Sequence, residues 1–146
     1  MGVLIRQARG AEQERLREIA LAAKSNWGYD PDLVRAWVDG LLFEGGTERW
    51  VAEADGEAAG WASLLPPADG TCVLEDLWVA PTWMHRGIGR QLFRAVAERA
   101  RRLGADKLCW SADPNAVGFY EQLGAHIVGE TIGEWGRPLP TMEIAL

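Results

Sequence analysis

The residues best suited to chemistry lie in a glycine-containing turn at positions 86–91. The turn reads Arg86-Gly87-Ile88-Gly89-Arg90-Gln91 and separates a β-like run that ends at Val79 from a helix-like run that reaches Leu103. Glycine lets a ligand approach the main chain closely, and the first N–H groups of a helix have no intrahelical partners. The helix dipole also favours an anion there. The turn therefore predicts a binding site for the diphosphate of a nucleotide-like cofactor.

Two better-known phosphate-binding motifs do not fit this turn. A P-loop needs Gly-Lys-Ser/Thr, which the turn lacks, and a dinucleotide fingerprint needs glycine where Leu92 stands. A tight strand-to-helix turn without a ligand remains the structural alternative, because Gly-x-Gly alone is weak evidence.

The distribution of charge favours a small phosphorylated ligand over a nucleic acid. The net charge is −6, but residues 84–107 contain seven Lys or Arg and two acidic residues, a local balance of +5 that leaves −11 for the rest. Affinity for a polyanion depends on a basic surface, so nucleic-acid binding is not expected. Some of these arginines will simply form the solvated face of a helix.

Length and composition predict a single domain over residues 1–146. A chain of 146 residues, 48% hydrophobic and 25% charged, fits one domain of ordinary size. No apolar run is long enough to cross a bilayer and no signal peptide is evident, so we expect a cytoplasmic protein without membrane association. Cys72 and Cys109 fall in predicted strands without the spacing of a metal or redox site, so buried, reduced thiols and no metal are expected.

Hydrophobic periodicity and turn signals predict an α+β fold in the order β-α-α-β-β-β-α-β-α-β-β. Asp30-Pro31 is typical of a helix start, and Asp55-Gly56 of a two-residue hairpin. The predicted strands are 3–7, 49–54, 57–65, 71–79, 107–111, 126–130 and 141–146. The predicted helices are 12–24, 31–41, 89–103 and one introduced at 113–115 that runs through 123.

This order and two motifs resemble the GNAT superfamily of acyl-CoA-dependent N-acyltransferases. Met84-His85-Arg86-Gly87-Ile88-Gly89 matches the family motif Gln/Arg-x-x-Gly-x-Gly/Ala at both small positions and departs from it at Met84. The segment 115–125, with Phe119-Tyr120, is similar to the family's second motif. Further segments, among them 23–29 and 136–140, look like a bacterial subgroup without a settled substrate, so the reaction class carries over and the acceptor does not.

The resemblance implies the GNAT fold, a mixed central sheet of about six to seven strands flanked by about four helices. It also implies acetyl-CoA as cofactor and direct transfer of the acetyl group to a primary amine in a ternary complex. A non-catalytic acyl-CoA sensor of the same fold is the alternative. The cofactor-binding residues it implies are Leu77, Trp78, Val79, Met84, His85, Arg86, Gly87, Ile88, Gly89, Arg90 and Asn115.

The candidate catalytic residues are Tyr120, which aligns with the general acid of the family, and Glu75 and Asp76, which lie on the strand that ends at Val79. A phenol with a reference pKa of about 10 stays protonated at neutral pH and can protonate a thiolate of reference pKa about 8.5. Glu75 and Asp76, expected on opposite faces of one strand, are candidate bases that act directly or through water. The structural alternatives are a core aromatic for Tyr120 and surface charge for the two acids.

Other positions have two open interpretations. Asn115 resembles the family residue that bonds the pantetheine arm, and it is also a candidate N-cap. Trp27, Tyr29 and Trp135 are candidates for an aromatic wall that contacts the acceptor, a small-molecule or peptide amine. Hairpin or dimer packing explains Trp135 equally well, and homodimers are common in the family. Trp37, Trp50 and Trp61 are expected to pack in the core or on the sheet.

Overall fold

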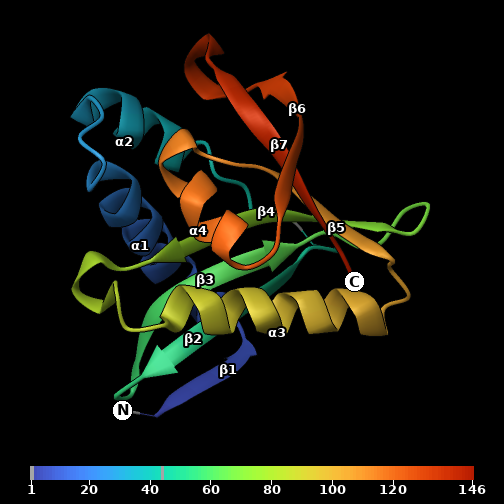
Figure 1. The fold of residues 1–146 in the computed structure, drawn as a ribbon. Coiled ribbons are helices and arrows are strands. Elements are labelled where there is room, and N and C mark those ends of the chain that lie inside the picture. Colours follow the sequence, from blue (N-terminus) through green and yellow to red (C-terminus); the bar gives the residue numbers. More distant parts are fainter. Residues whose placement is uncertain (1, 44) are drawn as a thin grey trace.

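The computed structural model describes residues 2–43 and 45–146, which form one seven-stranded sheet in the order β1-β2-β3-β4-β5-β7-β6 (Figure 1). The strands are β1 (Val3–Gln7), β2 (Glu48–Ala54), β3 (Glu57–Leu64), β4 (Thr71–Val79), β5 (Lys107–Ser111), β6 (His126–Ile132) and β7 (Pro138–Ala145). The helices are α1 (Gln13–Ser25), α2 (Pro31–Asp39), α3 (Ile88–Arg102) and α4 (Val117–Gln122), with short 3₁₀ turns η1 (Gly10–Glu12), η2 (Pro81–Trp83), η3 (Pro114–Ala116) and η4 (Glu134–Gly136). The predicted α+β class and the mixed sheet are confirmed.

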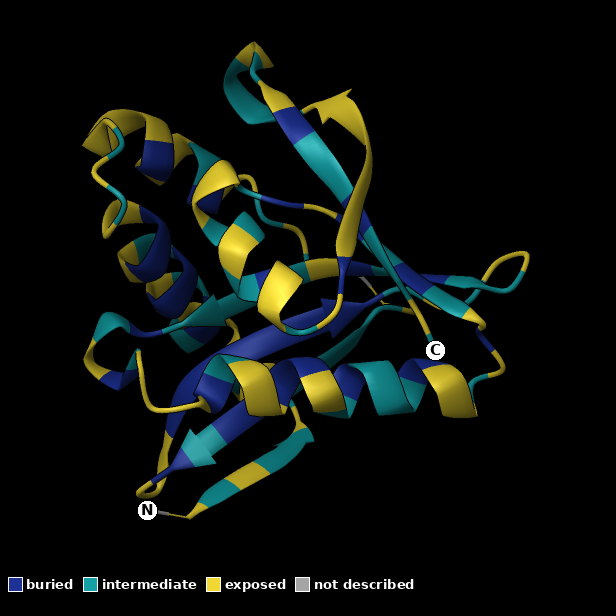
Figure 2. Ribbon diagram, in the orientation of Figure 1, coloured by how far each residue is buried: buried dark blue, intermediate teal, exposed yellow. Residues whose placement is uncertain are grey.

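Helices cover both faces of the sheet, as the alternation of side chains along β3 shows. Trp61 is buried, and its indole N–H donates to the carbonyl of Leu16 in α1 at 2.9 Å. The neighbouring Gly60 faces the other way, where an added Cβ would lie 3.1 Å from Leu92 of α3. Figure 2 shows the buried residues along the inner sides of the helices and in the central strands. The sheet is therefore enclosed between α1 and α2 on one face and α3 on the other.

Strands β4 and β5 pair for only part of their length. Thr71–Val73 of β4 run parallel to residues 107–109 of β5, but β4 continues to Val79 with pairing to β3 alone. The N–H of Ala80 donates to the carbonyl of Ala59 in β3 at 2.8 Å. Because successive residues of a strand direct their peptide groups to alternate sides, the main-chain groups of Leu77 and Val79 face the gap that β5 leaves open.

Helix α3 begins where the glycine turn changes direction. Gly87 caps the start of α3 with a left-handed φ of +81°. At the other end of the helix, Gly104 follows the C-cap residue Leu103 and has a φ of +95°. The observed start at Ile88 lies one residue before the predicted one. Both glycines adopt a conformation that costs any other L-residue free energy.

The strands of the hairpin β6–β7 extend closer to its tip than predicted, because β6 ends at Ile132 and β7 begins at Pro138. The last strand was predicted to begin at residue 141, but Pro138 and Pro140 already lie in β7, where they pair with Ile132 and Glu130 of the edge strand β6. Pro138 is the first residue of its strand, a position that needs no ladder donor. The hairpin tip is therefore the short segment 133–137, in which Trp135 has a left-handed φ of 64°.

Both cysteines lie in strands and form no disulfide. Cys72 is buried, as expected, whereas Cys109 is only partly buried and lies on the face of β5 opposite the buried Leu108 and Trp110. Within the described ranges, no helix is long and apolar enough to span a membrane, and no three His, Cys, Asp or Glu side chains gather as a metal site would require.

Candidate active site

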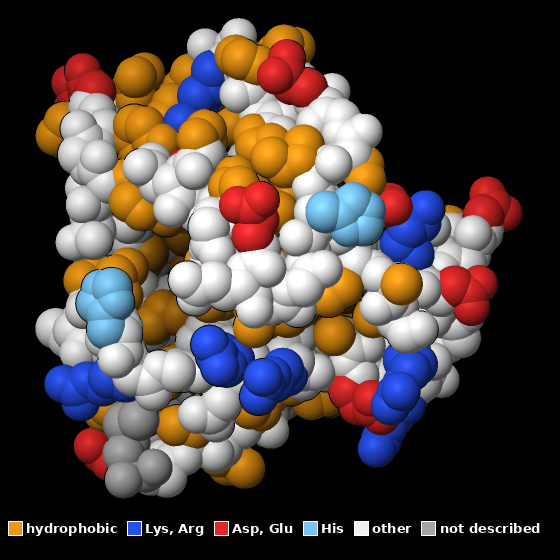
Figure 3. Space-filling model, viewed as in Figure 1, with side chains coloured by type: hydrophobic (Ala, Val, Ile, Leu, Met, Phe, Trp, Pro, Cys, Tyr) orange, Lys and Arg blue, Asp and Glu red, His pale blue; other side chains and the backbone are white. Residues whose placement is uncertain are grey.

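A cavity of 620 Å³ lies between the open edge of β4, the start of α3 and the η3–α4 segment. Figure 3 shows apolar side chains lining a hollow above the start of α3. The cavity is lined by all of the predicted cofactor-binding residues except Arg86, whose guanidinium lies over the Trp83 ring at 4.9 Å. One sequence motif and one neighbouring strand therefore form a continuous wall.

The start of α3 offers main-chain donors to this cavity. The first intrahelical bond runs from the N–H of Gln91 to the carbonyl of Gly87 at 3.1 Å, so the N–H groups of residues 88–90 have no intrahelical acceptor. The first turn contains no acidic residue. An added Cβ at Gly89 would lie 3.2 Å from the Phe119 ring, so glycine lets α3 and α4 approach closely here. These features fit a diphosphate group.

The basic residues around the turn are less concentrated than the sequence suggested. Arg99, Arg101 and Arg102 lie in the last turn of α3, far from the glycines, and form ion pairs with Glu48 and Glu98. Among the described lysines and arginines, only Arg90 lines the cavity. Attraction of an anion therefore depends on the main-chain groups more than on side-chain charge.

Tyr120 lies at the inner end of the cavity. Its side chain is 7% exposed and packs against Phe93, Trp110 and Phe119, with ring centroids 4.8–5.9 Å apart. Burial raises the pKa of Tyr120, and the nearby Asp76 and Asp113 charges raise it further. The hydroxyl is therefore protonated over the whole neutral range and is available as a donor. Tyr120 also lines a narrow neck of 60 Å³ that leads away from the cavity.

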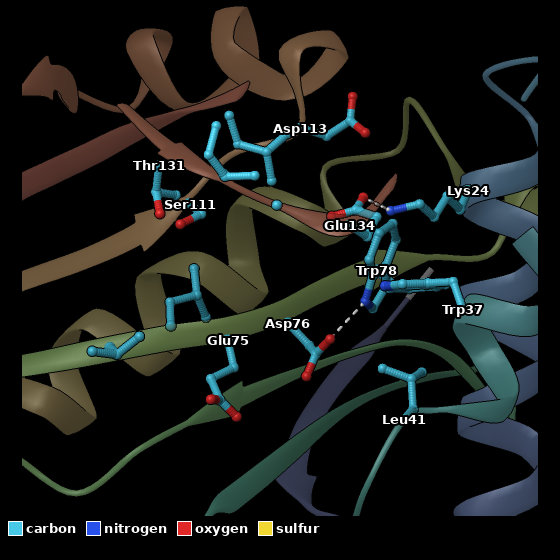
Figure 4. Close-up of a pocket in the computed structure, with 15 residues that line it drawn as sticks. Lys24, Trp37, Leu41, Glu75, Asp76, Trp78, Ser111, Asp113, Thr131 and Glu134 are labelled. Carbon is cyan, nitrogen blue, oxygen red and sulfur yellow. Dashed lines mark hydrogen bonds and ion pairs between the residues drawn. The ribbon is translucent and has the colours of Figure 1, made fainter. Parts of the chain in front are cut away.

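The neck leads to a second cavity of 480 Å³ on the side of α1 and α2 (Figure 4). Glu75, Asp76 and Trp78 of β4 line both the neck and this second cavity. Trp78 also lines the first cavity. The two cavities therefore meet beside β4, close to Tyr120.

Glu75 and Asp76 both face the second cavity, although consecutive strand residues were expected on opposite faces. Ser63 of β3 pairs with Asp76, and Leu64 pairs with Leu74, so Glu75 is an extra residue in β4. Such a β-bulge redirects neighbouring side chains. Glu75 is exposed, whereas Asp76 accepts hydrogen bonds from Ser63 Oγ at 2.7 Å and Trp78 Nε1 at 3.1 Å. Burial raises the pKa of Asp76, and these hydrogen bonds oppose the rise.

Lys24 forms part of the far wall of the second cavity. Its side chain is 2% exposed, ion-paired with Glu134, and placed 4.1 Å from the Trp37 ring and 5.0 Å from the Trp135 ring. Burial lowers the pKa of Lys24, while Glu134 opposes that effect. Trp37, expected to be a packing residue, lines the cavity beside Lys24.

Comparison with known proteins matches residues 13–125 to the acetyltransferase (GNAT) family. The chain belongs to the GNAT family. It is 28% identical over 130 residues to the peptidyl-lysine N-acetyltransferase YiaC of Escherichia coli (strain K12), covering 86% of the chain and 84% of that relative. It is 34% identical over 137 residues to the mycothiol acetyltransferase of Nocardia farcinica, covering 92% of the chain but only 44% of that longer protein.

Solved structures share the fold of this GNAT protein. The PaiA N-acetyltransferase of Thermoplasma acidophilum, solved in complex with coenzyme A, has a TM-score of 0.81 at 19% identity over the full length of both chains. A GCN5-related N-acetyltransferase from Rhodopseudomonas palustris has a TM-score of 0.86 at 22% identity, over 100% of this chain and 97% of its own. Family members use acetyl-CoA, and the diphosphate-compatible cavity of this GNAT protein agrees with that donor.

The predicted aromatic wall is divided in this GNAT protein. Trp27 lines the first cavity and the neck, whereas Tyr29 and Trp135 line none of the three spaces. The Tyr29 and Trp135 rings instead pack edge-on at 5.1 Å. The rings that face the second cavity are those of Trp37 and Trp78.

Asn115 lines the first cavity but does not cap the following helix. Asp113 is the N-cap of η3 and accepts from the N–H of Asn115 at 2.8 Å. The Asn115 amide donates to the Tyr29 hydroxyl at 2.8 Å. That hydroxyl donates to Asp113 and accepts from Arg137 at 2.6 Å. The N-cap interpretation of Asn115 is therefore wrong, because the residue two positions earlier already has that role.

The sequence interpretation missed several residues that face or support the second cavity. Lys24 is the last residue of the predicted helix 12–24, and a lysine at such a position is usually exposed to solvent. Its partner Glu134 lies 110 positions away in the sequence, so no local pattern indicates the contact. The one local signal was the pair Glu134 and Arg137 in an otherwise apolar loop. The omitted residues are Lys24, Trp37, Ser111, Asp113, Glu134 and Arg137.

Proposed function

We propose that this GNAT protein transfers the acetyl group of acetyl-CoA to a primary amine by direct attack in a ternary complex. The observation that carries the proposal is the meeting of two cavities at Tyr120, Glu75 and Asp76. One cavity suits a diphosphate-containing donor, and the other, lined by carboxylates, suits a cationic acceptor. Two occupants bound at once would meet at the neck.

The chain's main-chain groups are suited to hold the donor. The N–H groups of residues 88–90 face the diphosphate position, and the outward-facing groups of Leu77 and Val79 can pair with the pantetheine amides as an added strand does. Acetyl-CoA supplies an activated acetyl thioester. The Val79 N–H, directed into the gap between β4 and β5, is our candidate for stabilising negative charge on the carbonyl oxygen.

The proton transfers involve a carboxylate, which accepts a proton, and a phenol, which donates one. The Asp76 or Glu75 carboxylate accepts a proton from the acceptor ammonium, directly or through water in the neck. The raised pKa of Asp76 makes it a stronger base than an ordinary carboxylate. Tyr120 donates its hydroxyl proton to the departing sulfur. The attacking nitrogen loses its second proton as the amide forms, and this proton restores the phenol, while the carboxylate releases its own proton to water. A buried phenol keeps that proton at neutral pH, so the donor is ready in each turnover.

Direct attack agrees with the positions of the cysteines. Neither Cys72 nor Cys109 is among the described residues that line the two cavities or the neck. Burial raises the pKa of both thiols, which disfavours the nucleophilic thiolate. A covalent acetyl-cysteine step therefore has no suitably placed residue.

The acceptor class follows from the carboxylates of the second cavity. Glu75, Asp76, Asp113 and Glu134 line it beside a single cation, Lys24. The relatives include the peptidyl-lysine N-acetyltransferase of Escherichia coli and a streptothricin acetyltransferase of Streptomyces lavendulae, which is 35% identical over 115 residues. A small-molecule or peptide amine is the acceptor that we propose.

The test is a panel of small and peptidyl amines incubated with acetyl-CoA and the full chain. Release of free thiol above the amine-free rate, together with an N-acetylated product in the mass spectrum, is the expected result. A Tyr120→Phe variant serves as the matched control. Tight acetyl-CoA binding without amine-dependent release would instead identify a sensor and overturn the proposal.

A further inference from the structure

A neutral cluster of four charged side chains lies at the far wall of the second cavity, where Lys24, Asp113 and Glu134 line the cavity and Arg137 supports the two acids. Lys24 and Arg137 both contact Glu134, and Arg137 also donates to Asp113 at 2.9 Å. The two cations balance the two acids. The wall therefore has no net charge with which to attract an anion, although its lysine is a strong hydrogen-bond donor.

Lys24 has more donors than the described residues accept. An ammonium has three N–H bonds. Glu134 accepts one, and the other close neighbours are the faces of Trp37, Trp135 and Trp78. Lys24 lines the cavity, and Figure 4 shows its ammonium at the cavity wall beside Glu134. A ligand in the cavity therefore meets a nearly desolvated donor, for which an unmade hydrogen bond is costly.

Lys24 and Asp76 contact the same indole. The Lys24 ammonium lies 5.6 Å from the Trp78 ring, and the indole N–H of Trp78 donates to Asp76 at 3.1 Å. The Trp78 indole therefore lies between Asp76, the proposed base, and Lys24, the buried donor. Apolar side chains, including those of Leu41, Leu74 and Leu139, also line the second cavity.

We infer that Lys24 is a specificity-determining residue that donates a hydrogen bond to a neutral carbonyl oxygen of the acceptor. The acceptor class is then an amine joined by a short aliphatic chain to an amide. The inference rests on the proposed acetyl transfer. A carboxylate in place of the amide would add negative charge to a cavity that, besides this neutral cluster, is lined by the acids Glu75 and Asp76, so it binds less well.

Three probes of similar amine basicity test this inference: 6-aminohexanamide, 6-aminohexanoate and hexylamine. We expect the wild-type chain to acetylate the amide with a kcat/KM at least about 10-fold above that of the other two. Lys24→Met should reduce this preference to about one, mainly by raising KM for the amide. Lys24→Gln keeps a neutral donor and should retain part of the preference. Unchanged acetyl-CoA affinity is the control for folding of both variants.

Two outcomes overturn the inference. One is a wild-type preference of about one, or a preference for the carboxylate, which decides the matter even if Lys24→Met does not fold. The other is a preference for the amide that survives in Lys24→Met with its KM unchanged. Failure of every amine in the wider panel would contradict the proposed acetyl transfer itself, so the two failures are distinguishable.

Discussion

Replacing Gly87 by alanine separates a backbone effect on stability from an effect on acetyl-CoA binding. Gly87 has a φ of +81°, and an added Cβ would meet no atom within 4 Å, so the cost is conformational and not a clash. A left-handed alanine costs about 1–2 kcal/mol. Gly104, at the opposite end of α3, has a φ of +95° and equal space, so Gly104→Ala is a matched control.

Both variants should therefore lose about 1–2 kcal/mol of unfolding free energy, or about 3–6 °C in Tm. Gly87→Ala should also weaken acetyl-CoA binding. Relaxation of the strained residue rotates the N–H groups of residues 88–90, and loss of one hydrogen bond to a charged group costs about 1.5–3 kcal/mol, or about 10- to 100-fold in Kd. Gly104→Ala should leave that Kd unchanged.

Calorimetric titration of both variants with acetyl-CoA and with S-acetylpantetheine, which lacks the diphosphate, is the assay. Gly87→Ala should bind acetyl-CoA more weakly and S-acetylpantetheine as the wild-type chain does. Equal acetyl-CoA affinities for the two variants, at equal loss of stability, would refute the diphosphate assignment.

Three further predictions concern individual titratable groups. Tyr120→Phe should lower kcat by about 100- to 10,000-fold without changing the Kd for acetyl-CoA; a rate within a few-fold of wild type would leave Tyr120 as a packing residue only. Since burial raises the pKa of Asp76, kcat/KM should fall on the acid side at a pH above that of an ordinary carboxylate. Asp76→Asn should abolish this decline in rate at acid pH. Ser63→Ala removes a hydrogen bond that stabilises the Asp76 carboxylate, so it should move the decline to higher pH. Identical pH–rate profiles for the wild-type chain and both variants would contradict the role of Asp76 as base. The Arg6 hydrogen bonds lower the pKa of Glu12 to about 2, so this pair stabilises the fold above the unfolded pKa of 4.5 and loses its effect as the pH falls toward 2. Glu12→Gln should therefore cost about 1 kcal/mol at neutral pH, after allowance for solvent screening, and less at about pH 3, as measured by urea unfolding.

Elements with local signals were predictable from the sequence. Asp30 caps α2 by accepting from the N–H of Asp32 at 2.8 Å, as its position before a proline indicated. Asp55 and Gly56 form the β2–β3 turn with φ values of 50° and 79°. Such features depend on a few adjacent residues, and the order of strands and helices followed from them.

The first cavity was also predictable, because most of its wall consists of the glycine turn, the strand before it and the second motif, which contains Asn115 and Tyr120. The second cavity was not. The bulge at Glu75 depends on pairing with β3, which no pattern within β4 indicates. The contact of Lys24 with Glu134 joins α1 to the β6–β7 hairpin, and the burial of a lysine contradicts its usual preference for solvent.

The central claim is that acetyl-CoA binds with its diphosphate at the start of α3, and amide NMR of the isotope-labelled chain tests it most directly. Titration with acetyl-CoA should shift the backbone amide resonances of residues 88–90, Leu77 and Val79, whereas those beside the separate 240 Å³ cavity near Gln7 and Thr47 stay unchanged. Shifts confined to that separate cavity, with unmoved resonances at residues 88–90, would contradict the account.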